Sequence, residues 1–231
     1  MEIIDYEGEI KKKRLENIQR VQREARNPQK QLFEKINNFR ERHSNSWTND
    51  ELIEKIKTDE IFAAVFAVDP AKQNLYENLA ADFIRNIDGV ENFINLPNQT
   101  KMFVVNGEIT SIRSNEVKSI DFTWNVGEYT IYSSHKYTGT GTGTAQKHQY
   151  FEQRNFMRNC LDSKDPHVIF LAICDGPYYE RFGCIEELNN DFRTPNSIAL
   201  TSRDLPRFCE SLSKGIGIKS FKTDSSLLYN L

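Results

Sequence analysis

The stretch that decides the fold and the chemistry of this chain runs from Val117 to Glu152 and reads VKSIDFTWNVGEYTIYSSHKYTGTGTGTAQKHQYFE. Its first part holds two apolar-rich runs, 117–124 and 129–137, separated by a short turn sequence. This pattern predicts two antiparallel strands joined as a hairpin. The first strand carries an acid, Asp121, and the second ends with a lysine, Lys136. Because paired strands bring distant residues within a few ångströms, we expect these two side chains to meet.

The residues after Lys136 form a Gly/Thr loop, TGTGTG, at 138–143. The polar segment 145–161 follows, and its spacing predicts a helix with Tyr150, Phe151, Phe156, Met157 and Leu161 facing inward. The loop lacks the Gly-Lys-Ser/Thr ending of a P-loop, so we expect its glycines to allow close approach of the backbone to a ligand.

Helical periodicity dominates the chain before this stretch, and β patterns with helices dominate after it. We expect the apolar helix 59–68 to be buried, and Asp69-Pro70 to start the helix 71–87. The core side of that helix is predicted as Leu75, Leu79, Phe83, Ile84 and Ile87. The further predicted elements are helices at 3–25, 29–43, 50–57 and 202–212, a hairpin at 102–112 around Asn106-Gly107, and strands at 168–174 and 197–201.

This order predicts an α/β (α+β) fold, with a mixed central β-sheet flanked by helices. We expect an N-terminal helical region at 1–68 and a core at 69–231, together forming one compact unit. Apolar residues make up 38% and charged residues 27% of the 231 residues, as in soluble globular proteins. The chain has no apolar run near the roughly 20 residues of a membrane span, and a charged N-terminus argues against a signal peptide.

The four cysteines, Cys160, Cys174, Cys184 and Cys209, show no metal-ligand spacing. We expect free buried thiols in a reducing cytoplasm. The net charge is −3, but residues 10–42 carry eleven Lys and Arg against four Glu. A solvated helix face explains this excess as well as a DNA contact does, and the segment also suits dimer contacts.

The segments KSIDFTW, YTIYSSHKY and GTGTAQKHQYFEQRNFM resemble the active-site region of type II restriction endonucleases of the PD-(D/E)xK superfamily. In that pattern an acid on one strand is followed by acid-x-Lys on the next strand and then by a helix that supports the site. The stretches DPAKQNLYENLAADFI, VIFLAICDGPYY and SIALTSRDL also look like these enzymes. The resemblance covers roughly residues 69–212.

The resemblance implies that Asp121 binds Mg²⁺ and that Lys136 is catalytic, but the acid-x-Lys position reads Ser134-His135-Lys136. A hydroxyl is a poor Mg²⁺ ligand, so the second carboxylate has to come from elsewhere. Glu152 on the following helix and Glu77 on the earlier one are the two candidates. Gln146 and Gln149 are candidates to assist through water.

The implied function is Mg²⁺-dependent hydrolysis of double-stranded DNA at a short specific site, giving 5′-phosphate ends, by a cytoplasmic bacterial or archaeal homodimer. A structure-selective repair or recombination nuclease and a non-catalytic DNA-binding protein remain alternatives. For His135 and His148 we favour polar contacts over metal binding, and for Asp175 a turn position. The candidates for DNA contact are Ser134, His135, Thr138, Thr140, Thr142, Gln146, Gln149, Tyr178, Tyr179, Arg181, Arg193 and Asn196.

Overall fold

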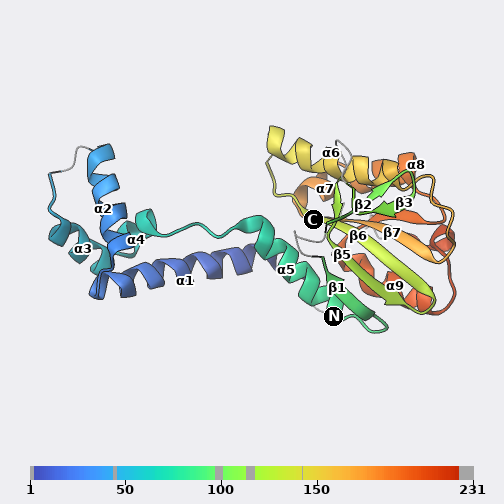
Figure 1. Ribbon diagram of the computed structural model, residues 1–231, viewed down its shortest axis with the longest axis horizontal. Helices are drawn as coiled ribbons and strands as arrows, with labels where there is room; N and C mark the ends of the chain where they lie inside the picture. The colour runs from blue at the N-terminus through green and yellow to red at the C-terminus, as the bar shows by residue number, and fades with distance from the viewer. Residues whose placement is uncertain (1–2, 44–45, 97–100, 113–117, 142, 224–231) are drawn as a thin grey trace. The chain divides into compact units, whose positions relative to one another are not determined.

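The computed structural model describes residues 3–43, 46–96, 101–112, 118–141 and 143–223 (Figure 1). The chain divides into two compact units rather than the single unit expected from the sequence. One is a helical unit, Asp5–Leu75, and the other contains the sheets and begins at Tyr76. The division therefore falls within a helix, a few residues after the predicted boundary at 68.

The helical unit is built from four helices, which the sequence pattern predicts to within a few residues. Two local hydrogen bonds stabilise the start of α3: the Thr48 side chain accepts from the backbone N–H of Glu51, and the Glu51 side chain accepts from the backbone N–H of Thr48. Apolar side chains from all four helices form one core. The helices are α1 (Tyr6–Arg26), α2 (Lys30–His43), α3 (Asn49–Thr58) and α4 (Glu60–Phe66).

The prediction of a fully buried helix at 59–68 is wrong. Ala63 and Phe66 are buried, but Ile61 is 84% exposed and Val65 is 59% exposed. A helix of two turns that packs on one side leaves its other side in solvent, whatever its composition. The next helix, α5, spans Lys72–Arg85, so it begins one residue after the predicted start at 71. The Asp69 carboxylate, which was expected to cap it, lies 3.2 Å from Arg14.

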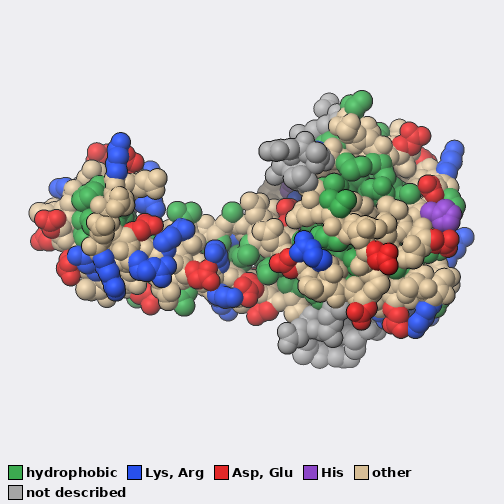
Figure 2. Space-filling model, turned by 60° about the horizontal axis from the view of Figure 1, so that its bottom comes forward, with side chains coloured by type: hydrophobic (Ala, Val, Ile, Leu, Met, Phe, Trp, Pro, Cys, Tyr) green, Lys and Arg blue, Asp and Glu red, His purple; other side chains and the backbone are tan. Residues whose placement is uncertain are grey.

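Basic side chains of the predicted DNA-contacting segment lie beside acidic ones on the same helices. Lys13 lies 2.8 Å from Glu16, and Lys12 lies 3.5 Å from Glu9. Figure 2 shows Lys and Arg interspersed with Asp and Glu over the visible face of this unit. The surface is therefore of mixed charge, and its contact with DNA stays a prediction.

The second unit contains a five-stranded sheet in the order β1-β5-β6-β7-β8. The pairs β1–β5 and β5–β6 are antiparallel, whereas β6–β7 and β7–β8 are parallel. The mixed sheet predicted from the sequence is thus present, and β1, which the sequence reading missed, adds one edge. The strands are β1 (Glu91–Asn95), β5 (Phe122–Val126), β6 (Tyr129–Tyr137), β7 (Val168–Asp175) and β8 (Ser197–Leu200).

Helices cover both faces of this sheet (Figure 1). Buried side chains of α5 and α9 share one core with β5, and those of α6, α7 and α8 share the other with β7. Because β7 is apolar on both faces, it contributes to both cores. The remaining helices are α6 (Thr144–Asn159), α7 (Pro177–Arg181), α8 (Cys184–Phe192), α9 (Leu205–Ser213) and the 3-10 turns Ser202–Asp204 and Ile218–Ser220.

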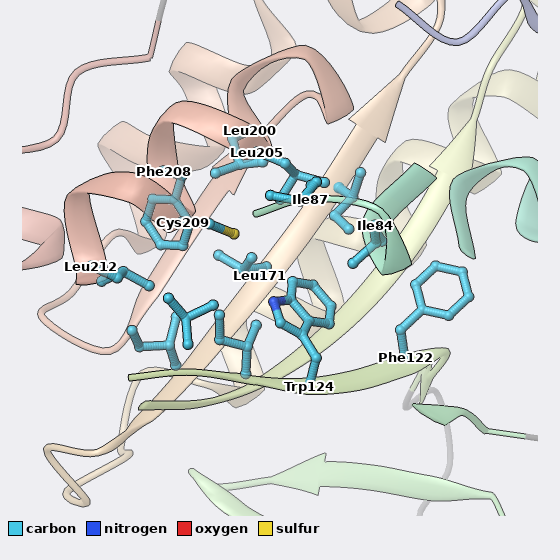
Figure 3. Close-up of a cluster of buried hydrophobic side chains, with 14 of the residues drawn as sticks. Ile84, Ile87, Phe122, Trp124, Leu171, Leu200, Leu205, Phe208, Cys209 and Leu212 are labelled. Atoms are coloured by element: carbon cyan, nitrogen blue, oxygen red, sulfur yellow. The ribbon is translucent and has the colours of Figure 1, made fainter. Parts of the chain in front are cut away.

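The first core is shown in Figure 3, where Phe122 and Trp124 of β5 project toward the same side as Leu171 of β7. Residues two apart on a strand share a face. The alternation of apolar and polar residues in β5 therefore places Phe122 and Trp124 together in this core. From α5, Ala80, Ala81 and Ile84 are buried, whereas the predicted Leu75, Leu79 and Phe83 are only partly buried. Small residues let this helix pack closely on the sheet.

A second, three-stranded sheet has the order β3-β2-β4, with β2 at Met102–Val105, β3 at Glu108–Thr110 and β4 at Ser119–Ile120. The hairpin predicted around Asn106-Gly107 is confirmed, and both residues have positive φ, 50° and 79°. On α6, Phe151 is 51% exposed and Leu161, just beyond it, is 40% exposed, so their predicted inward positions are wrong. None of the helices in the described ranges is long and apolar enough to cross a membrane.

Candidate active site

Asp121 lies at the point where the chain passes from the small sheet to the large one. The strand predicted at 117–124 is divided there, because β4 pairs with β2 and β5 pairs with β6. The last paired residues of β5 and β6 are Phe122 and Ser133, and the Asp121 backbone N–H donates to the Ser133 carbonyl at 2.7 Å. Its carboxylate then accepts the backbone N–H of His135 at 2.8 Å. Directly before the start of β5, the Asp121 side chain thus accepts a backbone N–H of β6 that a strand carbonyl would otherwise accept.

The Asp121 carboxylate therefore lies against the backbone of His135, the residue directly before Lys136. The carboxylate also faces a second lysine that the sequence reading missed. The Lys118 ammonium lies 2.7 Å from Oδ1 and 2.9 Å from Oδ2 of Asp121. Both side chains are nearly buried, with 10% of Lys118 and 12% of Asp121 exposed. The Asp121 charge is therefore compensated within the protein.

Lys136 pairs with Glu152, one of the two glutamates proposed from the sequence. Its ammonium lies 2.8 Å from the Glu152 carboxylate, and 12% of Lys136 and 31% of Glu152 are exposed. The pair forms because α6 covers the face of β6 on which Lys136 lies. His148, one helical turn earlier, is 3.8 Å from the other carboxylate oxygen. The helix thus delivers a carboxylate to the end of β6.

Ser134, at the position where the family pattern has an acid, is completely buried. Within the described residues its Oγ has no hydrogen-bond partner. Gln153 of α6 reaches the same place, and its Nε2 donates to the carbonyls of Ser134 and Ile173 at 3.3 Å each. The sequence reading missed Gln153, although it lies one turn after Gln149 and so on the same helix side. Its Oε1 is also buried without a hydrogen-bond partner in the described part of the chain.

The His135 side chain lies on the other face of β6. Its Nε2 is 3.3 Å from Oδ2 of Asp175, and both residues are buried. Oδ1 of Asp175 accepts the backbone N–H of Ser202 at 2.8 Å. Asp175 ends β7 directly before Gly176-Pro177, as the sequence reading expected, and it also connects β6 and β7 to the 3-10 turn that begins at Ser202. Sequence alone gave no signal for this pairing, since it depends on the parallel register.

Glu77 lies on α5, which covers the face of the sheet opposite α6, and its side chain is half-buried. Its neighbour Tyr76 stacks on Tyr137, at the end of β6, with ring centroids 4.3 Å apart. The helix start is thereby attached to the strand that carries Lys136. Participation of Glu77 in the site stays a prediction.

Burial removes several side chains from the candidates for direct DNA contact. Thr138 donates to Gln149 at 2.9 Å, and Arg193 donates to the carbonyls of Ile218 and Phe221. Asn196 donates to carbonyls before and within β7. Thr140, Gln146 and Arg181 retain exposed or half-exposed side chains, and Thr142 lies outside the described residues. The side chains buried from DNA in this conformation are Ser134, His135, Thr138, Tyr178, Tyr179 and Asn196.

The donor set limits the kind of metal that the site accepts. Within the described ranges, no group of three or more His, Cys, Asp or Glu side chains is placed to hold a metal ion. Mg²⁺ commonly takes one or two protein carboxylates and fills its remaining positions with water and phosphate oxygens. Asp121 and Glu152 fit that smaller requirement, and each is balanced by a lysine.

The chain matches none of the known protein-family models, and no curated protein is detectably similar to it in sequence.

Proposed function

We propose that the protein is a Mg²⁺-dependent endonuclease that hydrolyses double-stranded DNA at a short specific sequence, as a type II restriction endonuclease does. The observation that carries this proposal is the 2.8 Å pairing of Lys136 with Glu152. The residue directly before Lys136, His135, donates its backbone N–H to the carboxylate of Asp121. The pairing of Lys136 with Glu152 supports the substitution suggested by the resemblance, in which a helix glutamate replaces the acid missing at Ser134. The order of strand, strand and covering helix agrees with the same pattern.

The chemistry would be divided between two carboxylates and a lysine. Asp121 and Glu152 would hold Mg²⁺, which supplies a Lewis acid for the phosphate when it is bound. Lys136 brings a positive charge to the same position, where it would orient a water molecule and balance the negative charge that develops on the phosphate. The backbone N–H of His135 keeps the Asp121 carboxylate oriented.

Cutting both strands of a symmetric site would require two copies of this centre, so we propose a homodimer. Among the candidates for DNA contact in the described residues, Thr140 and Arg181 are exposed, and Gln146, Gln149 and Arg193 are half-exposed. The helical unit would supply further backbone contacts, which depend on salt concentration because they neutralise phosphates.

The full-length protein should be incubated with a long plasmid and MgCl₂, with EDTA in a parallel reaction. Discrete fragments that require Mg²⁺ are expected. A smear would favour the structure-selective or non-specific nuclease, and an uncut plasmid with a gel shift would favour a non-catalytic DNA-binding protein.

The residue assignment is tested with Asp121→Asn and Lys136→Met, each of which should abolish cutting while DNA binding remains. Lys147→Met is a matched control, because this lysine lies on exposed surface of α6. Normal cutting by either site variant would show that the residue is not part of the catalytic centre.

A further inference from the structure

The Lys118 ammonium lies where a cation would bind Asp121. It contacts both carboxylate oxygens, at 2.7 and 2.9 Å, and also lies 3.3 Å from the carbonyl of Ser119. We propose that Lys118 is an internal counter-cation, which balances Asp121 when no divalent ion is bound and competes with that ion for the carboxylate. This inference rests on the proposed Mg²⁺ site and adds a residue that controls its affinity.

Among the lysine–acid pairs recorded in the described residues, this pair is the most buried, followed by Lys136–Glu152. Lys13 and Glu16 have the same sequence spacing and a similar distance, 2.8 Å, but about half of each side chain is exposed. Lys118 and Asp121 are only 10% and 12% exposed. Exposed ion pairs contribute little to stability, whereas removal of one partner from a buried pair leaves a charge without compensation. Lys118 therefore balances the charge of the Asp121 carboxylate inside the protein.

The arrangement around the carboxylate explains the competition. Oδ2 already accepts the His135 N–H at 2.8 Å in addition to Lys118, and Oδ1 accepts from Lys118. A carboxylate offers about four lone-pair positions, so three of them have donors. A divalent ion approaching both oxygens would meet the ammonium at the same position, and like charges at such short distances repel strongly. Binding of the ion to both oxygens thus requires Lys118 to move away, and binding to one oxygen is weakened by repulsion from its ammonium.

Lys118 and Lys136 have different partners, which separates their roles. Lys136 pairs with Glu152 on α6. Lys118 precedes β4, and the ion pair recorded for it in the described residues is with Asp121. Removal of Lys118 should consequently raise the affinity for Mg²⁺, while removal of Lys136 should affect the reaction.

The test measures Mg²⁺ binding rather than DNA cutting. Isothermal titration calorimetry with MgCl₂ and thermal unfolding with and without MgCl₂ are carried out on the full-length wild type, Lys118→Met and Asp121→Asn. Lys13→Met is the matched control, because Lys13 is exposed and also lies three residues before its acidic partner, Glu16. Lys118→Arg keeps the positive charge.

For Lys118→Met we expect a lower melting temperature without Mg²⁺, a larger rise on adding Mg²⁺, and roughly tenfold tighter binding or more. Lys118→Arg and Lys13→Met should bind Mg²⁺ as the wild type does, and Asp121→Asn should lose binding. If Lys118→Met does not fold, Lys118→Gln takes its place with the same expectations.

The outcomes separate this inference from the proposed function. If Asp121→Asn abolishes Mg²⁺ binding but Lys118→Met binds no more tightly than wild type, the competition is refuted and the metal site stands. If binding does not depend on Asp121, or no variant binds Mg²⁺, both proposals fail. Binding that is detected in Lys118→Met but not in wild type would support the competition strongly.

Discussion

The Lys136 ammonium lies 2.8 Å from the Glu152 carboxylate, although the two residues belong to a strand and to the helix that follows it. The Gly/Thr loop between them turns the chain back over the sheet, so that one face of β6 is covered by its own continuation. Position 134 on the same face carries a hydroxyl instead of an acid. In the proposed metal site, Glu152 supplies the carboxylate that position 134 lacks.

Glu152→Gln should abolish DNA cutting, or reduce it by at least about 100-fold, because it removes a carboxylate from the proposed metal site while preserving the shape of the side chain. The free energy of unfolding should fall by about 1–2 kcal/mol, since Lys136 is only 12% exposed and loses its charged partner. Plasmid cleavage and urea unfolding measure the two effects. Glu108→Gln, on the exposed end of β3, is the control. Full activity in Glu152→Gln would remove this residue from the site.

Gly176→Ala should destabilise the protein by about 3 kcal/mol, because it combines backbone strain with a steric clash. Gly176 has a φ of 100°, and an added Cβ would lie 2.4 Å from the Thr138 carbonyl oxygen. Gly127 has a φ of 56° with nothing within 4 Å of an added Cβ, so Gly127→Ala isolates the strain. We expect about 1 kcal/mol for that control. Equal losses in urea unfolding would mean that the contact with Thr138 is not important.

Ser134→Ala should change the free energy of unfolding by less than about 0.5 kcal/mol, because a hydroxyl without a hydrogen-bond partner contributes nothing that alanine lacks. Ser197 is also fully buried, but its hydroxyl donates to the Phe192 carbonyl at 2.9 Å. Ser197→Ala should therefore cost about 1–2 kcal/mol. Chemical denaturation of the two variants makes the comparison. A large loss in Ser134→Ala would instead indicate a water molecule bound between Ser134 and Gln153.

The buried thiols should react slowly with Ellman's reagent at pH 8 in the folded protein and rapidly after unfolding, because the thiolate is the reactive form. Desolvation by burial, followed by the nearby Glu187 and Glu186, raises the pKa of Cys184 to about 11. Desolvation raises the pKa of Cys209 to about 12. In the unfolded chain these thiols ionise earlier, so the folded state binds more protons and loses stability as the pH rises from about 9 to about 11. Fast labelling of the folded protein would contradict the burial.

Ile61→Ser should leave the stability of the helical unit within about 0.5 kcal/mol of wild type, because an exposed residue gains little from being apolar. Phe66, on the other side of the same helix, is 5% exposed. Phe66→Ala should cost about 3 kcal/mol or more. Circular dichroism during urea unfolding measures both. A large loss in Ile61→Ser would mean that another surface covers this side of α4.

Sequence periodicity by itself determined most of the local structure. The alternation in 122–137 predicted the β5–β6 hairpin, and the unbroken apolar run at 168–174 predicted a central strand. Because the two strands adjoin, the pattern also predicted that the Asp121 and Lys136 side chains would meet. That stays a prediction: the Asp121 carboxylate accepts from the backbone of His135, and the Lys136 ammonium pairs with Glu152. The strand predictions succeed because side-chain alternation is a property of the chain itself.

The tertiary structure alone decided which side chains are buried and which charges meet. Asp121 divides a predicted strand because the small sheet takes Ser119 and Ile120 as its own edge. Lys118 reaches Asp121 only through that division. The apolar helix α4 leaves Ile61 and Val65 exposed, whereas the polar Ser134 is fully buried next to α6. Burial depends on the surface that packs against a residue, and a local pattern contains no information about that partner.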